Sequence, residues 1–344
     1  MTTNKNNETA KDFQKKSKLS NFEDASFTIL IFIIILLIIS NPTKYTSGTI
    51  SGLKLFFFSV LPGLFPFMLL TKLITEIGFV FNASQKLDSF SHKIFGTPGV
   101  SIYAFIMSIV SGYPIGAKII SDLYQKGQIS ENDAKKMSIF CTTSGPIFVI
   151  GTVGTVMFQN YKFGIILYTS HIISSVLLGI FYNLIFCRTK KQEPQKSQVI
   201  LATKKSNIIA ECISQTINSL FVVGAYITIF YLITEILESI KLFSSLSKLL
   251  SPILSKIGIN TNVFEGLLYG ILEVTRGAKT LSSASGILPV VFTSGILSFS
   301  GISIIMQSMA FLKEAKIKAY TFTLFKCVHA ILSMILCYLL LIIF

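Results

Sequence analysis

The sequence has few charged residues and no tryptophan. Asp, Glu, Lys and Arg make up 13% of its 344 residues, whereas a soluble protein of this length carries roughly a quarter. Hydrophobic residues make up 51% and are gathered in long blocks, without the alternation of a strand or the 3.6-residue period of an amphipathic helix. These features exclude an ordinary soluble domain and predict an all-α polytopic membrane protein in contact with the lipid bilayer.

Cysteine is also sparse, with five residues in or at the edges of apolar blocks and no CxxC spacing. Neither a disulfide framework nor a metal cluster is indicated, and free thiols in apolar surroundings are the expected state. The sequence has no GxSxG, HExxH or Walker motif and no acidic metal cluster. We therefore expect no catalytic residue, no metal and no cofactor, and we predict that the protein is not an enzyme.

Uncharged blocks divide the chain into segments suited to a bilayer. Residues 1–24 are polar and predicted to be disordered, and residues 25–40 are predicted to form a first transmembrane span. We interpret this span as uncleaved, because its polar leader is too long for a signal peptide and "NPTKYTSG" follows it. The further embedded blocks are 52–78, 98–124, 138–158, 163–187, 214–238, 263–287, 288–310 and 319–343.

Two halves of the chain, 52–187 and 207–344, share short motifs in the same order on either side of a basic linker, 188–206. Chance matches are common in apolar sequence, so the motifs alone leave duplication and coincidence equally open. Gly116-Ala117-Lys118 corresponds to Gly277-Ala278-Lys279, Thr143-Ser144-Gly145 corresponds to Thr293-Ser294-Gly295, and "LLTKLITE" at 69–76 resembles "YLITEILE" at 231–238.

Positive charge is distributed as two repeats of opposite orientation would require. If the N-terminus lies inside and both 98–124 and 263–287 are re-entrant hairpins, inside segments carry 19 Lys and Arg and outside segments carry five. The first repeat then begins outside and ends inside, and the second does the reverse. Inverted repeats of this kind occur in many secondary transporters. The N-terminus and linker are cytoplasmic in this topology, and the C-terminus lies outside. Full crossings by the two hairpins would scramble part of the bias.

This asymmetry accounts for most of the net charge of +14 without a nucleic-acid partner. A solvated inside loop is the preferred interpretation of the basic linker, over a role at the membrane surface. The oligomeric state stays open.

The motif SGYP, at 111–114, interrupts an apolar block where a spanning helix would be continuous. Pro114 lacks an N–H and disfavours helical geometry at Tyr113, and Gly112 permits backbone conformations that other residues avoid. We predict two half-helices that meet at this bend, the second beginning near Pro114 or Ile115 and capped by Ser111. A proline-kinked spanning helix is the alternative.

Charged residues inside embedded blocks are the best indication of a site, because each is costly in a bilayer unless it is paired or hydrated. Lys118 and Lys279 hold matching places in the repeats, so a pseudo-two-fold axis would bring both to a shared site for an anionic or hydrogen-bonding solute. Pairing of Lys118 with Asp122, four residues later, and snorkelling of both lysines to opposite interfaces are the alternatives.

In the second half, Glu273 and Arg276 are spaced to pair on a helix, and Thr275 is placed to cap the break before Gly277. The stretches "TTSGPIFVIGTVG" and "FTSGILSFSG" both combine hydroxyl residues with glycine and a predicted helix break. They would offer hydroxyls and freed carbonyls to a ligand, although such residues also mediate close helix packing. The candidate substrate path contains Ser111, Gly112, Pro114, Gly116, Lys118, Thr143, Ser144, Gly145, Glu273, Thr275, Arg276, Gly277, Lys279, Thr293, Ser294 and Gly295.

Two histidines and one lysine lie deep in other blocks. Lys326 and His329 are in the last block and His171 is in an earlier one. A proton relay through them is conceivable, but a packed or interfacial histidine is the more common state.

Four stretches together resemble the sporulation integral membrane protein family of endospore-forming bacteria, often labelled YlbJ. They are "LKLFFFSVLPGLFPFMLLTKLI", "SGYPIGAKIISDLYQKGQIS", "FCTTSGPIFVIGTVG" and "GILEVTRGAK". The resemblance covers nearly everything from about Gly52 onward and is strongest over 111–154.

The resemblance implies two Gate-type, or nucleoside-recognition, repeats in a cell-membrane protein needed for normal cortex formation and spore resistance. It supplies no substrate, because the nucleoside label rests on kinship of fold. Two hypotheses remain. One is a permease for a small polar solute, nucleoside-like or ionic, with its site between the two hairpins. The other is a non-transporting membrane scaffold for spore-envelope assembly.

Overall fold

The structure, a computed structural model, describes residues 28–29, 31–77, 79–186, 207–256 and 258–344. Within these residues the chain is helical and contains no strand, which confirms the predicted all-α class. Four helices are long and apolar enough to cross a membrane, and up to six spans result if each of two bent helix pairs is one span. The protein is therefore a multi-pass membrane protein. Residues 1–24, which are predicted to be disordered, and the predicted linker 188–206 lie outside the described residues.

Residues up to Ile50 form one unit and residues Ser51–Phe344 form another. In the first unit, the helix Ile31–Ser40 is followed by α2 (Pro42–Leu55), with a bend of 111° between them. The predicted span 25–40 thus reaches spanning length only together with the next helix.

The second unit contains two halves. The first consists of the π-helix η1 (Phe56–Val60), α3 (Leu61–Ile77), α4 (Phe79–Ser84), the 3₁₀-helix η2 (Gln85–Leu87), α5 (Asp88–Phe95), α6 (Val100–Ser111), α7 (Ile115–Gln125), α8 (Glu131–Phe140), the π-helix η3 (Ile147–Met157) and α9 (Tyr161–Phe186). The second consists of α10 (Ile208–Ser239), α11 (Leu242–Lys256), α12 (Thr261–Leu272), α13 (Val274–Ser282), α14 (Ile287–Phe299), α15 (Gly301–Leu312), the 3₁₀-helix η4 (Lys313–Ala315) and α16 (Ala319–Ile343).

The halves have the same order of elements. Each has a long first helix (α3 or α10), a pair of half-helices (α6 and α7, or α12 and α13), two helices separated by a break (α8 and η3, or α14 and α15) and a long last helix (α9 or α16).

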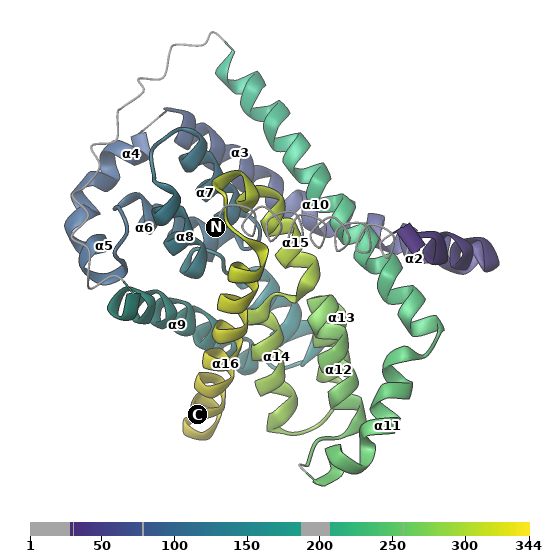
Figure 1. The fold of residues 1–344 in the computed structure, drawn as a ribbon. Coiled ribbons are helices and arrows are strands. Elements are labelled where there is room, and N and C mark those ends of the chain that lie inside the picture. Colours follow the sequence, from purple (N-terminus) through teal and green to yellow (C-terminus); the bar gives the residue numbers. More distant parts are fainter. Residues whose placement is uncertain (1–27, 30, 78, 187–206, 257) are drawn as a thin grey trace, which may run out of the picture. The chain divides into compact units, whose positions relative to one another are not determined.

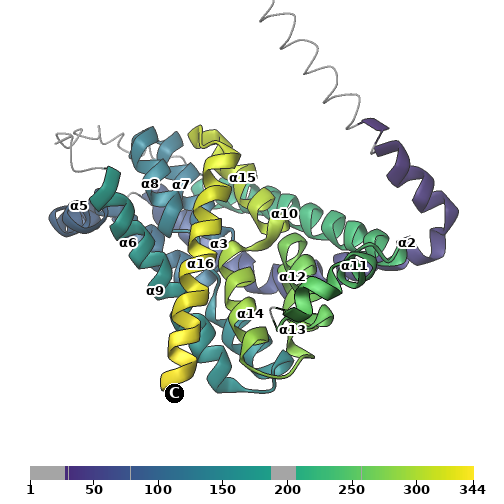
Figure 2. The same cartoon turned by 60° about the horizontal axis from the view of Figure 1, so that its bottom comes forward.

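Contacts between the halves are reciprocal. The first helices of the two halves pack on each other, α3 on α10, and so do the last helices, α9 on α16. The half-helix α7 of the first half packs on α15 of the second, and the equivalent α13 packs on η3 of the first. Likewise α9 packs on α14, and the equivalent α16 packs on α8. Figures 1 and 2 show α16 beside α14 in the same half. Such an exchange of partners is what two repeats related by a pseudo-two-fold axis produce, and it supports the predicted duplication. Their orientation in the membrane stays a prediction.

The first hairpin turns at the SGYP motif. The helix α6 ends at Ser111 and α7 begins at Ile115, with Gly112 at a φ of 81° between them. A Cβ atom placed on Gly116 would lie 2.9 Å from the hydroxyl of Ser108, although residues eight apart in one helix are separated by about 12 Å along its axis. The chain therefore folds back on itself, which confirms the predicted break and excludes a kinked spanning helix. The predicted cap is wrong, because Ser111 Oγ is buried without a hydrogen-bond partner and no side chain caps α7.

The second hairpin turns at Glu273, the single extended residue between α12 and α13. The two half-helices pack closely through glycines. A Cβ atom on Gly277 would lie 2.2 Å from Gly270 Cα and 2.9 Å from the carbonyl oxygen of Gly266. The backbones can approach this closely only because these positions lack side chains.

The break in the second repeat lies elsewhere than predicted. Thr293, Ser294 and Gly295 are inside the continuous helix α14, and the chain leaves helical geometry at Ser300, with a φ of 79°. Proline follows Gly145, whereas isoleucine follows Gly295, so nothing interrupts the helix there. Gly295 instead makes room for Met334, whose sulfur would lie 2.7 Å from an added Cβ atom.

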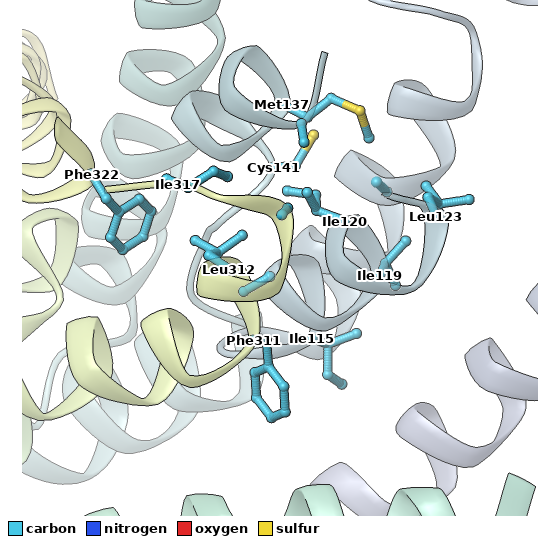
Figure 3. Close-up of a cluster of buried hydrophobic side chains, with 14 of the residues drawn as sticks. Ile115, Ile119, Ile120, Leu123, Met137, Cys141, Phe311, Leu312, Ile317 and Phe322 are labelled. Atoms are coloured by element: carbon cyan, nitrogen blue, oxygen red, sulfur yellow. The ribbon is translucent and has the colours of Figure 1, made fainter. Parts of the chain in front are cut away.

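A hydrophobic cluster holds the return half of the first hairpin in place. Buried side chains of α7 pack against the end of α15. Figure 3 shows Ile115 beside Phe311 and Ile120 beside Leu312. The half-helix that carries Lys118 is thus fixed by apolar contacts with the other repeat.

We predict that Gly277→Ala destabilises the protein by about 1–3 kcal/mol, because the added methyl group overlaps the backbone of α12. The measurement is the midpoint of thermal unfolding of purified protein in detergent. Gly63→Ala is the matched control: Gly63 is also helical, nothing lies within 4 Å of an added Cβ atom, and its midpoint should stay level or rise. Equal loss in both variants would show that α12 and α13 are not closely packed.

Candidate functional site

Lys118, the central candidate of the first repeat, belongs to a compact group of charges. Its Nζ lies 2.9 Å from Asp122 Oδ1, and Asp122 Oδ2 lies 3.3 Å from the Nζ of Lys72 on α3. Glu76 Oε1 in turn accepts contacts from Lys72, at 3.2 Å, and Lys126, at 3.0 Å. We call these five residues the α3–α7 ion cluster. Each of its three lysines contacts at least one of its two carboxylates, so the pairing alternative for Lys118 is the one observed.

A small cleft opens beside this cluster. It has an empty volume of about 280 Å³, open mouth included, and lies between α3, α7 and α10. Lys72, Lys118 and Asp122 line it together with polar side chains that include Gln215 and Thr216. The cleft is polar, but its charged residues already have partners.

A second group of charges has the matching place in the other repeat. Arg276 on α13 pairs through Nη2 with Glu235, at 3.1 Å, and Glu238, at 2.7 Å, both on α10. Glu273 does not pair with the Arg276 side chain as predicted. Its carboxylate instead accepts the backbone N–H groups of Thr275, at 3.0 Å, and Arg276, at 2.8 Å. Glu273, and not Thr275, therefore caps α13, because an extended residue before a helix places its side chain over the free amides.

The two matched lysines do not meet. Lys118 Nζ lies 5.5 Å from the centre of the Phe311 ring, among buried groups of α7 and α15. Lys279 is exposed on α13. The structure therefore places the two lysines in different surroundings and not at one shared site.

The breaks of the first repeat do come together. A Cβ atom on Gly112 would lie 2.6 Å from the nitrogen of Gly145, so the SGYP and TTSG turns touch through glycine. The N–H of Thr143 donates to Ser108 Oγ at 2.8 Å, and the N–H of Ser144 donates to His171 Nε2 at 2.9 Å. Candidate residues from two separate motifs thus form one buried centre.

Lys326 enters this centre from α16. It is 2% exposed, and its Nζ donates to the carbonyl oxygen of Thr142 at 2.6 Å and to the hydroxyl of Tyr113 at 3.0 Å. Tyr113 also shares a hydrogen bond with Ser300, at the break of the second repeat. No ion pair joins Lys326 to a carboxylate in the described part of the chain. A buried cation with only neutral partners therefore lies where three helix breaks meet.

Two histidines stack beside Lys326. The ring centres of His171 and His329 are 4.8 Å apart, and His329 Nε2 lies 3.0 Å from the carbonyl oxygen of His171. His171 Nδ1 lies 2.8 Å from the hydroxyl of Ser298 on α14. Each histidine is the eleventh residue of its helix, α9 or α16, so the two hold equivalent places in the repeats.

We call this group the central polar cluster: Ser108, Tyr113, Thr142, Thr143, Ser144, His171, Ser298, Ser300, Lys326 and His329. Chemically it offers one cation, two imidazoles and several hydroxyls in surroundings closed to bulk water. Among the described residues no three His, Cys, Asp or Glu side chains are grouped to hold a metal ion. The arrangement suits hydrogen bonding and proton binding to a small solute.

Lys326, His171 and His329 belong to the central polar cluster but not to the candidate path predicted from the sequence. The signal in the sequence is that His171 and His329 lie at equal distances from the starts of the last helices of the two halves. The shared motifs do not extend into these helices. Other predicted path residues lie apart from the contacts of the cluster: Ser111, Lys279 and the Thr293-Ser294-Gly295 motif. Within that motif, Ser294 forms hydrogen bonds with Ser170 and Ser333 nearby.

We predict that Asp122→Asn destabilises the protein by on the order of 3 kcal/mol, because it leaves the buried ammonium of Lys72 and the neighbouring Lys118 without their shared carboxylate. Thermal unfolding in detergent measures the loss. Glu131→Gln is the matched control, since its only ion pair, with Lys316 at 4.0 Å, is exposed and should change stability by less than about 0.5 kcal/mol. A control that loses as much as Asp122→Asn would contradict the role of the cluster.

Comparison with known proteins gives one curated relative. The sequence is 28% identical over 322 residues to the sporulation integral membrane protein YlbJ of Bacillus subtilis (strain 168), which covers 88% of this chain and 78% of that protein. No protein-family model and no solved structure matches the chain. Because the similarity covers 88% of the chain, it confirms the resemblance carried by the motifs: the chain is similar over most of its length to the sporulation integral membrane protein YlbJ.

Proposed function

We propose that the protein is a multi-pass membrane protein of spore formation that moves a small polar solute across the bilayer between its two helical hairpins. The solute is nucleoside-like or ionic and carries negative charge or several hydrogen-bond acceptors. The link to spore formation, through cortex assembly and spore resistance, rests on the relative's name and the family resemblance. The chain acts on the solute by binding and release, without enzymatic chemistry.

The observation that supports transport is the environment of Lys326. Several other buried or half-buried cations have partners of opposite charge, as Lys72 and Lys118 have in Asp122, and as Arg276 has in Glu235. Lys326 is more buried than these, and its partners among the described residues are all neutral: the Thr142 carbonyl, the Tyr113 hydroxyl and the rings of Tyr113 and Phe322. A buried cation costs several kcal/mol unless an opposite charge compensates it. An anionic or acceptor-rich solute would supply that partner.

The place of Lys326 in the fold also supports the proposal. It contacts Tyr113 and Thr142, which belong to two breaks, and through Tyr113 it reaches Ser300 at the third. In secondary transporters, broken helices from both repeats line the solute site, because freed backbone groups and helix ends bind solute there. A path through this protein would run past the same three breaks.

A membrane scaffold makes a different demand on Lys326. In a scaffold, the lysine only has to satisfy the carbonyl group of Thr142, and any donor of similar length would serve. A permease requires the charge itself. Replacing the ammonium by an uncharged donor therefore separates the two functions.

We predict that Lys326→Gln reduces solute flux at least tenfold while the protein keeps its fold, because the amide still donates to Thr142 but carries no charge. The measurement is uptake into proteoliposomes of nucleosides, small carboxylates and divalent metal ions, each tested separately. Lys248→Gln is the control, since Lys248 is an exposed lysine on α11, outside the two hairpins, and should leave flux unchanged. Absence of flux for every solute would favour the scaffold, whereas full flux in Lys326→Gln would show that transport does not depend on the charge at Lys326.

The orientation has its own test. We predict that a reporter fused within 188–206 is active in the cytoplasm and that one fused after Phe344 is active outside, because the positively charged segments are retained inside. Paired fusions of a fluorescent protein and of alkaline phosphatase at both places measure this. A linker on the outside would overturn the inverted topology.

A further inference from the structure

The hydrogen bonds of the two histidines fix which nitrogen carries each proton. His171 Nε2 accepts the N–H of Ser144 at 2.9 Å, so its proton is on Nδ1, which donates to Ser298 Oγ at 2.8 Å. His329 Nε2 faces the carbonyl oxygen of His171 at 3.0 Å, and a carbonyl can only accept. The proton of His329 is therefore on Nε2, and its Nδ1 carries a lone pair.

That lone pair has no partner. His329 is 1% exposed, and its Nδ1 has no hydrogen bond to any described residue. His171, its equivalent in the other repeat, has both nitrogens occupied. A buried acceptor without a donor is costly, and in a functional centre it calls for an explanation. Protonation of Nδ1 is the change that this atom is free to make.

The charged and titratable groups around His329 determine when it takes up a proton. Lys326 is three residues before it on the same helix, so their side chains are neighbours, about 5–6 Å apart at Cβ. A second cation here repels the first. The helices α14 and α15 carry no charged residue, and the charged residues of α8 occupy 131–136 at its far end. Tyr113 approaches from the turn before α7. The remaining charged and titratable groups are Tyr161, Lys162, Tyr168, His171 and Tyr182 on α9 and Tyr320, Cys327, Cys337 and Tyr338 on α16 itself.

We infer that His329 Nδ1 is the proton-binding atom of the central polar cluster, and that an anionic solute bound at Lys326 brings a proton onto it. The coupling rests on the proposed function, whereas the proton site does not. With Lys326 alone, a second positive charge on His329 is disfavoured; an anion at Lys326 removes that repulsion. By linkage, protonation of His329 strengthens anion binding by the same factor. Solute and proton then move together.

The proton site is tested by nuclear magnetic resonance of protein labelled with ¹⁵N-histidine in lipid nanodiscs. The chain has three histidines, His92, His171 and His329, so His171→Gln and His329→Gln assign the signals. We expect His171 to carry its proton on Nδ1 and His329 on Nε2, and only His329 of this pair to gain a second proton as the pH is lowered. In Lys326→Gln, half-protonation of His329 should move to higher pH by about one unit, as removal of a neighbouring like charge predicts. Lys279→Gln should cause no such shift.

The site is wrong if His329 carries its proton on Nδ1, if His171 takes up the second proton first, or if Lys326→Gln leaves the protonation of His329 unchanged. These readouts require no transport, so they stand or fall apart from the proposed function.

The coupling is tested with a pH-sensitive dye inside proteoliposomes during uptake of the solute identified by the flux assay. We expect the interior to acidify with uptake, and His329→Gln, which keeps a donor for the His171 carbonyl but has no basic nitrogen, to abolish the acidification. Unchanged acidification in this variant would overturn the coupling. If no solute is transported but the ¹⁵N signals behave as expected, the proton site stands and the coupling falls together with the proposed function.

Discussion

The central constraint on this structure is that backbone groups freed by a broken helix need partners where no bulk water is available. Between α8 and η3, residues 141–145 have left helical geometry. The carbonyl of Thr142 accepts a hydrogen bond from Lys326. The amide of Thr143 donates to Ser108, and the amide of Ser144 donates to His171. These partners come from three different helices. The break therefore forms only when α6, α9 and α16 are assembled around it, which makes the central polar cluster a condition of the fold as well as a candidate site.

That constraint explains donors and acceptors, but it does not explain charge. A neutral amide would satisfy the Thr142 carbonyl, and an ammonium has three donors, of which two are used by Thr142 and Tyr113. Lys118, by contrast, is compensated within one helix turn by Asp122, and Arg276 is compensated across one helix pair by Glu235. Burial of the Lys326 ammonium has a desolvation cost, although the backbone carbonyl of Thr142 does not require a charged donor. Such an excess is expected of a group whose partner is supplied from outside the chain.

How much of this follows from the sequence depends on the range of the interaction. The break at Gly112 and Pro114 was predictable, because glycine and proline act on the backbone next to them. The pairing of Lys118 with Asp122 was predictable as an alternative from helix spacing. The Thr293-Ser294-Gly295 break was predicted wrongly, because the motif repeats the letters of the first half without its proline. The contacts of Lys326 were out of reach, since its partners Thr142 and Tyr113 are 184 and 213 residues away.

Comparison of the two last helices shows how a nearly symmetric fold acquires one site. The eighth residue is Tyr168 in α9 and Lys326 in α16, while the eleventh is histidine in both. Tyr168 donates to the carbonyl of Ile109 on α6, so it serves a backbone group as Lys326 does, without charge. Lysine at both places would put two like charges in one buried centre, which costs stability. The tyrosine therefore leaves a single cation beside a matched pair of histidines, and only one of these, His329, keeps an unpartnered nitrogen. The two repeats therefore supply equivalent positions for the histidines, and the difference at one position, lysine in place of tyrosine, gives the centre its single charge.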